Sequence, residues 1–381
     1  MAKFLKDLRT IYVVGIGWHR YQPLSETAYV ALGLQAIRQS LADAAIAWPD
    51  VESSYIGTGR LGMAAGRVML KHLGANGRPL VHIENASASG SAAFRHACIE
   101  VAAGIADVCL AVGVDKPAVV QRAYTKTGLD NLAEGAIVPF THFALLTDEY
   151  AHTHGVKPED IALVAVKNHR NGSLNPNAHR QQVRTLGEIL AGKPVSGTLT
   201  SLQCCPVGEG AAAVIVASED AIKRLGINAA RAVRVTASAA SSERAGLHSA
   251  ADAAITQHTI ADALQQAGLK PQHVDVLEVH DAFTVEELQY IEAMGACEPG
   301  QAIHLLKAGA FDIGGQMAVS PSGGLIAMGH PLGPTGIGQI AEITAQLRGE
   351  AGARQHKGAK TGLAHMVGTG AVCYAHVLQK S

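Results

Sequence analysis

The sequence is poor in aromatic residues and has no excess of charge of either sign. Of its 381 residues, 4% are aromatic and 17% are charged, and 31 Lys and Arg residues balance 32 Asp and Glu residues. A dedicated nucleic-acid-binding protein would carry a basic excess, and a disordered acidic protein would carry an acidic one. Because 48% of the residues are hydrophobic, the composition predicts a folded chain with a large core. We expect no nucleic-acid partner.

Long hydrophobic runs and metal-binding cysteine pairs are also missing. No stretch of 18 uninterrupted apolar residues occurs, so we expect no membrane-spanning helix and no membrane partner. The apolar run of residues 11–17 is too short for a signal sequence, and it predicts a buried strand in a cytoplasmic protein. The six cysteines form no Cys-x-x-Cys pair, and the adjacent Cys204 and Cys205 do not make a zinc signature. They predict buried thiols in a reducing compartment and no metal site.

Two stretches of alternating strand and helix signals predict an α/β fold. The first has strand signals at 11–17, 81–83 and 107–114, with helix signals at 26–46 and 91–105. The second has strand signals at 231–238 and 274–279, helix signals at 258–268, 286–294 and 335–347, and a glycine-interrupted strand pair over 362–378. Each stretch contains a turn of Ser and Gly, a buried helix and a following strand, which is suggestive of a duplication.

The segment between the two stretches has a different character. Residues 116–200 are rich in polar residues and have few β-like runs, which predicts an irregular insertion or lid rather than sheet. Regular structure returns with a buried strand at 211–217, followed by helix and linker over 220–230.

Four short stretches place reactive residues among Gly and Ala. They are residues 85–90, 280–283, 329–333 and 364–368. A serine in a turn before a helix, such as Ser87 or Ser89, often does no more than cap the helix. A single histidine among 18 is usually exposed or satisfied within a core. Taken alone, each stretch therefore also fits a structural role.

In combination and in this order, the stretches resemble the thiolase superfamily over nearly the whole chain. The residues that carry the resemblance are 85–90, 205–213, 278–284, 322–333 and 365–370. The His280-Asp-Ala-Phe283 stretch, with 168–170 and 175–178, is similar to sterol-carrier-protein-type and archaeal-type thiolases rather than to the short-chain biosynthetic enzymes.

The resemblance implies an α/β thiolase fold, with five layers in the order αβαβα built from two similar halves plus a loop domain. The first half would be residues 1–115, completed by 201–230, the loop domain 116–200 and the second half 231–381. Acyl-CoA would be the substrate, with no covalently bound cofactor. The resemblance also implies a homodimer or homotetramer, and a possible partner that is a small zinc-ribbon/OB-fold acyl-CoA-binding protein.

The resemblance also assigns roles to individual residues. The family motif Cys-x-Ser-Gly, with its cysteine nucleophile at the N-terminus of a buried helix, here begins at Ser87. A helix N-terminus lowers the pKa of such a thiol and can hold an oxyanion. His330 would activate the nucleophile and polarise the thioester carbonyl. His280 would support a water in the same oxyanion hole, and His365 would move the proton at the substrate α-carbon.

Backbone groups complete the site that the resemblance implies. The N–H group of Ser87, with those at Val367 and Gly368, would form the second oxyanion hole. The turn Ser322-Gly323-Gly324 would contact CoA.

Two departures from the family pattern affect these expectations. Ala282 stands where some sterol-carrier-type members have a second catalytic cysteine, and Cys373 lies too far from His365 to replace it. More seriously, Ser87 stands at the nucleophile position. A serine hydroxyl needs a base to attack, and its oxygen ester is lower in energy than a thioester, so return of the acyl group to CoA would run uphill.

Three explanations fit Ser87: an engineered Cys→Ser variant of a working thiolase, a natural serine in an enzyme with another reaction, or an inactive ligand-binding relative. The main functional hypothesis is a thiolase-type acyl-CoA C-acyltransferase that makes or thiolytically cleaves a 3-oxoacyl-CoA. The alternatives are a thiolase-fold retro-aldolase on a CoA thioester and a non-catalytic acyl-CoA-binding subunit.

Overall fold

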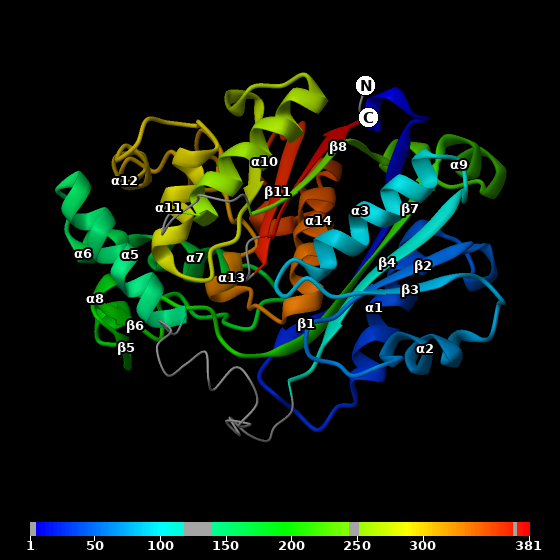
Figure 1. Ribbon diagram of the computed structural model, residues 1–381, viewed down its shortest axis with the longest axis horizontal. Helices are drawn as coiled ribbons and strands as arrows, with labels where there is room; N and C mark the ends of the chain where they lie inside the picture. Colours follow the sequence, from blue (N-terminus) through cyan, green and yellow to red (C-terminus); the bar gives the residue numbers. More distant parts are fainter. Residues whose placement is uncertain (1–4, 118–138, 244–250, 369–371) are drawn as a thin grey trace.

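The computed structural model describes residues 5–117, 139–243, 251–368 and 372–381. Ten strands form one sheet in the order β10-β9-β11-β12-β8-β1-β7-β4-β2-β3 (Figure 1). Their bounds are β1 Ile11–Gln22, β2 Ser53–Gly57, β3 Leu80–Ile83, β4 Val108–Asp115, β7 Glu209–Ser218, β8 Val233–Ser242, β9 Val276–Glu278, β10 Ala318–Val319, β11 Thr361–Gly368 and β12 Val372–Lys380.

The sheet consists of two halves with the same strand order. The first half runs β1-β7-β4-β2-β3 and the second β8-β12-β11-β9-β10. In each half the first three strands are antiparallel neighbours and the last three are parallel neighbours. The halves join where β1 pairs with β8 through Tyr12 with Arg234 and Val13 with Val233. The two similar halves that the sequence only suggested are therefore present.

Helices cover both outer faces and fill the space between the halves. Helix α1 (Tyr29–Ala44) packs on the outer face of the first half, and α10 (Ala251–Ala267) packs on that of the second. Helices α3 (Ser89–Ala102) and α14 (Leu332–Arg348) lie in the middle, where α14 contacts strands of both halves (Figure 1). Residues Gly333–Leu347 of α14 are all buried, as expected for a helix enclosed on every side. This arrangement confirms the predicted five layers.

The segment 116–200 is more regular than the sequence predicted. Its described part contains three helices up to residue 173, so the expectation of an irregular insertion was wrong for 139–173. Many polar residues of α7 face inward and bond there, so polarity did not mean exposure: Lys167, Asn168 and Asn171 are all buried. Residues 118–138 lie outside the described residues.

The remaining elements are short or peripheral. In Figure 1 helices α5, α6, α7 and α8 gather at one end of the molecule. Among the described residues no helix has the length and apolar character needed to cross a bilayer. The bounds are α2 Ala65–Leu70, α5 Pro139–His154, α6 Pro158–Ile161, α7 Leu163–Ser173, α8 Leu186–Leu190, α9 Glu219–Leu225, α11 Thr284–Ala293, α12 Ala302–Lys307, α13 Gly324–Ala327, and a small sheet of β5 Pro194–Ser196 with β6 Leu199–Thr200.

Candidate active site

Ser87 lies in a tight turn between β3 and α3. The preceding residue, Ala86, has a left-handed backbone with φ of 48°, which a residue other than glycine adopts rarely. Ser89 holds this turn, because its Oγ accepts a hydrogen bond from Asn85 N at 2.9 Å and donates one to Ala86 O at 2.7 Å. Ser89 is therefore the serine with the structural role of holding the turn, and Ser87 lines a cavity.

His330 lies in the corresponding turn of the second half, two residues before α14 begins. Its Nε2 is 2.9 Å from Ser87 Oγ, and its Nδ1 is 2.9 Å from Thr335 Oγ1. The Thr335 hydroxyl donates its one proton to Pro331 O at 2.6 Å. Thr335 must therefore accept from Nδ1–H of His330, which leaves the lone pair of a neutral ring on Nε2. In this tautomer His330 accepts the hydrogen bond from Ser87 and can act as its base.

Glycines bring the two turns this close. A Cβ at Gly90 of α3 would come within 3.0 Å of Gly333 O, and a Cβ at Gly336 of α14 would come within 3.0 Å of Ser91 Oγ. Real Cβ atoms do not tolerate such contacts, so only glycine lets the first turns of the two central helices touch. The Ser87–His330 contact depends on this approach.

Asp115, at the end of β4, holds the turn of His330 from the other side. Its carboxylate accepts hydrogen bonds from Gly333 N at 2.6 Å and from Thr58 Oγ1, Gly59 N and Arg60 N at 2.8 to 2.9 Å. Burial raises the pKa of this carboxyl, while the backbone donors act against that rise. Asp115 thus joins the start of α14 to the loop after β2.

His280 follows β9 and faces the same cavity. Its Nδ1 is 3.1 Å from Glu286 Oε1, in the first turn of α11, and the same oxygen accepts from Tyr290 Oη at 3.0 Å. A carboxylate only accepts, so Nδ1 carries the proton and Nε2 of a neutral ring carries the lone pair. This Nε2 is buried and has no hydrogen-bond partner in the described structure. The His280 and His330 rings meet nearly at right angles with centroids 5.4 Å apart.

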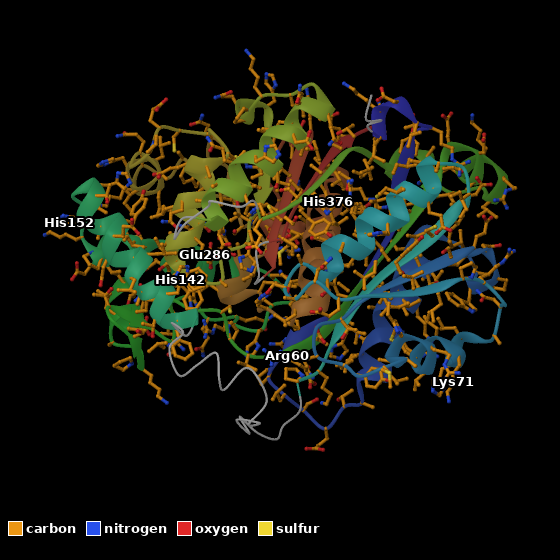
Figure 2. The ribbon with its side chains drawn as sticks, in the orientation of Figure 1. Arg60, Lys71, His142, His152, Glu286 and His376 are labelled. Carbon is orange, nitrogen blue, oxygen red and sulfur yellow. The ribbon has the colours of Figure 1, made fainter. Side chains whose placement is uncertain are left out.

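The cavity has a volume of about 730 Å³ and lies between the halves and the helical segment. Three of the six phenylalanines of this aromatic-poor chain line it, and two of them, Phe143 and Phe283, stack with centroids 4.3 Å apart. Glu286, His142 and Arg60, which are labelled in Figure 2, all line this cavity. The wall thus combines an aromatic surface with polar groups.

Burial sets the charge state of the groups in this cavity. It lowers the pKa of His330 well below its ordinary value, and His280 and Arg60 lower it further, so His330 is a neutral base. Burial also raises the pKa of Cys204 and of Cys205 to about 12. Both cysteines are therefore thiols rather than thiolate nucleophiles, although they line the cavity. No cluster of metal-binding side chains occurs among the described residues.

His365 is not among the residues that line this cavity. It is fully buried on β11, where its Nε2 is 2.9 Å from Thr256 Oγ1 and its Nδ1 is 3.5 Å from the backbone N of His280. Burial lowers its pKa to about 3. The structure therefore places His365 behind His280, as a neutral group in the core.

The predicted backbone and CoA contacts fall into two groups. Val367 lines the cavity, and a Cβ at Gly368 would come within 3.0 Å of Asn85 O, so the end of β11 lies against the turn of Ser87. The turn 322–324 does not line it. Ser322 instead bonds Glu278 through N at 2.9 Å and Oγ at 2.7 Å, and the positive φ of Gly323 and Gly324 starts α13 on the way to His330.

Sequence reasoning missed three residues that position the site: Thr335, Glu286 and Asp115. Each signal was weak. Thr335 follows His330 by five residues, and Glu286 lies three residues after Phe283, which is the spacing of a carboxylate in the first turn of a helix. Asp115 directly follows the strand predicted at 107–114, which is where functional residues of α/β proteins gather.

Comparisons with known proteins agree with this architecture. The family models "Thiolase, N-terminal domain" and "Thiolase C-terminal domain-like" match residues 20–186 and 236–380. Sterol carrier protein 2 of Gallus gallus is 36% identical over 95% of this chain and 70% of its own length. The benzoylsuccinyl-CoA thiolase subunit BbsB of Thauera aromatica is 33% identical over 91% of each chain. An acetyl-CoA acetyltransferase of Methanothermobacter thermautotrophicus is 31% identical over 98% of this chain and all of its own.

Solved structures share the fold at lower identity. A structure named Ltp2-ChsH2(DUF35) aldolase matches 97% of this chain and 98% of its own, with a TM-score of 0.84 at 21% identity. Human mitochondrial 3-ketoacyl-CoA thiolase in complex with CoA matches 98% of each chain, with a TM-score of 0.76 at 20% identity. The predicted resemblance is confirmed: the chain belongs to the thiolase family and is an enzyme of the thiolase type.

Proposed function

We propose that the protein makes or cleaves the carbon–carbon bond β to a CoA thioester, with Ser87 as the acyl acceptor. The observation that carries this proposal is the 2.9 Å contact of Ser87 Oγ with His330 Nε2, together with the tautomer imposed by Thr335. A serine hydroxyl attacks a carbonyl when a neighbouring base takes its proton. The neutral state of His330, whose pKa is held well below its ordinary value, supports it in that role.

Two further groups are proposed to act on the substrate. The start of α3 supports an oxyanion at the attacked carbonyl, because Ser87 lies two residues before the helix and a helix N-terminus favours negative charge, and the end of β11 lies against the same turn. His280 lines the cavity and its buried Nε2 has no hydrogen-bond partner among the described residues, so it is proposed to bind a water that donates to the thioester oxygen. It is also better placed than His365 to move the proton at the α-carbon, since His365 does not line the cavity.

The substrate is proposed to be a 3-oxoacyl-CoA with a large apolar or aromatic acyl group. The stacked Phe143 and Phe283 support such a group, and the benzoylsuccinyl-CoA thiolase subunit among the relatives carries a matching name. Exposed Arg60 at the cavity supports binding of the anionic CoA moiety. A role of Ser322, Gly323 and Gly324 in CoA binding is less well supported, because they are buried away from this cavity.

Assembly and location are part of the same proposal. We propose a homodimer or homotetramer in the cytoplasm. A small zinc-ribbon/OB-fold partner is supported by the structural neighbour whose name joins Ltp2 to ChsH2(DUF35).

The test uses acetoacetyl-CoA and larger 3-oxoacyl-CoA esters with the protein and its Ser87→Cys variant. We expect carbon–carbon cleavage by both proteins, and thiolysis of at least one substrate by Ser87→Cys when free CoA is present. Ser87→Ala is the matched control and should cleave none by acyl transfer. If Ser87→Cys cleaves no member of a broad panel, the proposal is wrong.

The second candidate is a retro-aldol cleavage of a CoA thioester. The observation that favours it is the free Nε2 of His280, a base that needs no acyl-enzyme. This reaction would release an aldehyde or ketone without free CoA, and it would survive Ser87→Ala.

A further inference from the structure

We propose that water, rather than CoA, resolves the acyl-serine formed at Ser87, so that the protein cleaves 3-oxoacyl-CoA hydrolytically into a carboxylic acid and a shorter acyl-CoA. This inference rests on the proposed function. It concerns the fate of the acyl group, which the exchange of sulfur for oxygen at one position alters.

Acylation of Ser87 would form an oxygen ester. An oxygen ester is stabilised by resonance that a thioester lacks, so transfer of the acyl group from Ser87 to the sulfur of CoA runs uphill. Attack by water on the same ester runs downhill. A cysteine enzyme exchanges one thioester for another at little cost, whereas a serine enzyme completes its cycle readily only when the acceptor is an oxygen nucleophile.

The geometry around Ser87 supplies a base for this second step. Once Ser87 Oγ carries an acyl group, it no longer donates to His330, and the Nε2 lone pair faces the ester. The contact of Thr335 with Nδ1 at 2.9 Å keeps the ring in this tautomer. His330 is therefore ready to take a proton from water, as it took one from Ser87.

His280 provides a second contact for that water. The contact with Glu286 at 3.1 Å keeps the proton on Nδ1, Nε2 is buried and has no hydrogen-bond partner among the described residues, and the residue lines the cavity. Its ring centroid is 5.4 Å from that of His330, so one small molecule can contact both rings. A water that donates to both lone pairs presents its oxygen to the ester carbonyl.

The two steps balance without any further reactant. In the first, Ser87 Oγ bonds to C3 of the substrate, the bond between C2 and C3 breaks, and the Ser87 proton passes to His330 and then by way of His280 to C2 of the departing acyl-CoA. In the second, the oxygen of water bonds to the acyl carbon and the bond to Ser87 Oγ breaks. One proton of water passes through His330 back to Ser87, and a carboxylic acid leaves. Nothing is oxidised or reduced.

Benzoylacetyl-CoA is a suitable probe, because each fate of its acyl group gives different products. Hydrolytic cleavage yields benzoate and acetyl-CoA, thiolysis yields benzoyl-CoA and acetyl-CoA, and simple thioester hydrolysis yields benzoylacetate and CoA. The experiment incubates the protein, Ser87→Cys and Ser87→Ala in ¹⁸O-labelled water, with and without free CoA. Products are identified by mass spectrometry, and quenched protein is examined for a benzoyl group on residue 87.

We expect the protein to turn over repeatedly without free CoA, to release benzoate with one ¹⁸O atom and to form little benzoyl-CoA when CoA is added. Ser87→Cys should form benzoyl-CoA when CoA is present, and Ser87→Ala should form neither product. Benzoyl-CoA as the main product of the unaltered protein would overturn the inference and leave the proposed function intact. So would a benzoyl-serine that forms once and does not turn over. If neither the protein nor Ser87→Cys cleaves this or any other 3-oxoacyl-CoA, the proposed function and the inference both fail.

Discussion

Removal of the Thr335 hydroxyl is the most direct test of the Ser87–His330 pair, because this hydroxyl determines which nitrogen of His330 carries the proton. Its Oγ1 accepts from His330 Nδ1 at 2.9 Å and donates to Pro331 O at 2.6 Å, and the side chain is 4% exposed. Thr335→Val keeps the shape of the side chain and removes the hydroxyl, which is both the acceptor for His330 and the donor to Pro331 O. Thr335→Ser keeps the acceptor and removes only a methyl group.

The expected effect follows from the hydrogen bond that is lost. In Thr335→Val the Nδ1–H group of the partly buried His330 ring stays unpaired, or the proton moves to Nε2, where it prevents His330 from accepting from Ser87. An unsatisfied buried donor costs about 1–3 kcal/mol. Because about 1.4 kcal/mol corresponds to a factor of ten in rate, we expect acylation of Ser87 to slow by roughly tenfold to a hundredfold.

Two measurements read this out. The first is the rate of Ser87 modification by a fluorophosphonate, which reports the reactivity of the hydroxyl without any assumption about the substrate. The second is the rate of acetyl-CoA formation from a 3-oxoacyl-CoA in a single turnover. Thr335→Ser should restore both rates to near the original, while the melting temperatures of the two variants show whether folding is affected equally. Equal rates in Thr335→Val and the unaltered protein would refute the proposed tautomer.

Three further predictions concern pH, a buried ion pair and a glycine. Burial holds the pKa of His330 well below 6.5, so the ring is neutral at neutral and mildly acidic pH. The rate of Ser87 labelling by a fluorophosphonate should therefore stay nearly constant from about pH 8 to about pH 6. A tenfold fall in this rate per pH unit, starting near pH 6.5, would contradict the prediction. Lys167→Met should lower the free energy of unfolding by about 3–5 kcal/mol, because it leaves the buried Glu287 carboxylate, whose Oε1 is 3.1 Å from Lys167 Nζ, without its positive partner. In denaturant unfolding, the double variant Lys167→Met with Glu287→Leu should recover most of this loss. No recovery would mean that the charge pair is not the cause. Gly90→Ala should lower the free energy of unfolding by about 1–3 kcal/mol and reduce activity, because the added Cβ would meet Gly333 O. Gly62→Ala is the control and should change neither, because a Cβ there has nothing within 4 Å. Equal melting temperatures and rates in the two variants would contradict the close approach of α3 and α14.

The sequence predicted the fold well where hydrophobic periodicity was strong. The buried helix expected at 91–105 is α3 (Ser89–Ala102), and the strand expected at 211–217 is β7 (Glu209–Ser218). Both are enclosed by other elements, so their apolar patterns are dense. The three helices of 139–173 were missed because their polar residues bond inward: Asn168 donates to Asp281 at 2.5 Å, which no periodicity in hydrophobicity reveals.

The site was predicted unevenly for a similar reason. The sequence motifs correctly predicted three residues that line the cavity, namely Ser87, His280 and His330. They could not show that His365 bonds Thr256 in the core, because a strand residue beside glycines has the same local sequence whether it faces a cavity or a helix. They also could not name Thr335 or Glu286, whose importance depends on which ring nitrogen each contacts.

The duplication explains why this site has two parts. Helices α3 and α14 occupy equivalent places in the chain of the two halves. Helix α3 follows the edge strand β3 and precedes β4, and α14 follows the edge strand β10 and precedes β11. In the sheet, β4 and β11 are each the third strand from the edge of their half. Ser87 and His330 each lie two residues before the first residue of their helix, so each half supplies one turn with one reactive side chain. Neither half can assemble the pair alone. The halves need the same backbone geometry of the turn and the glycine contact between the helices, but they do not need similar side chains. The repeat is therefore weak in the sequence and clear in the three-dimensional structure. Ser87 therefore changes the chemistry of the nucleophile without changing the geometry around it, because residues other than the nucleophile hold the turn, supply the base and set its tautomer.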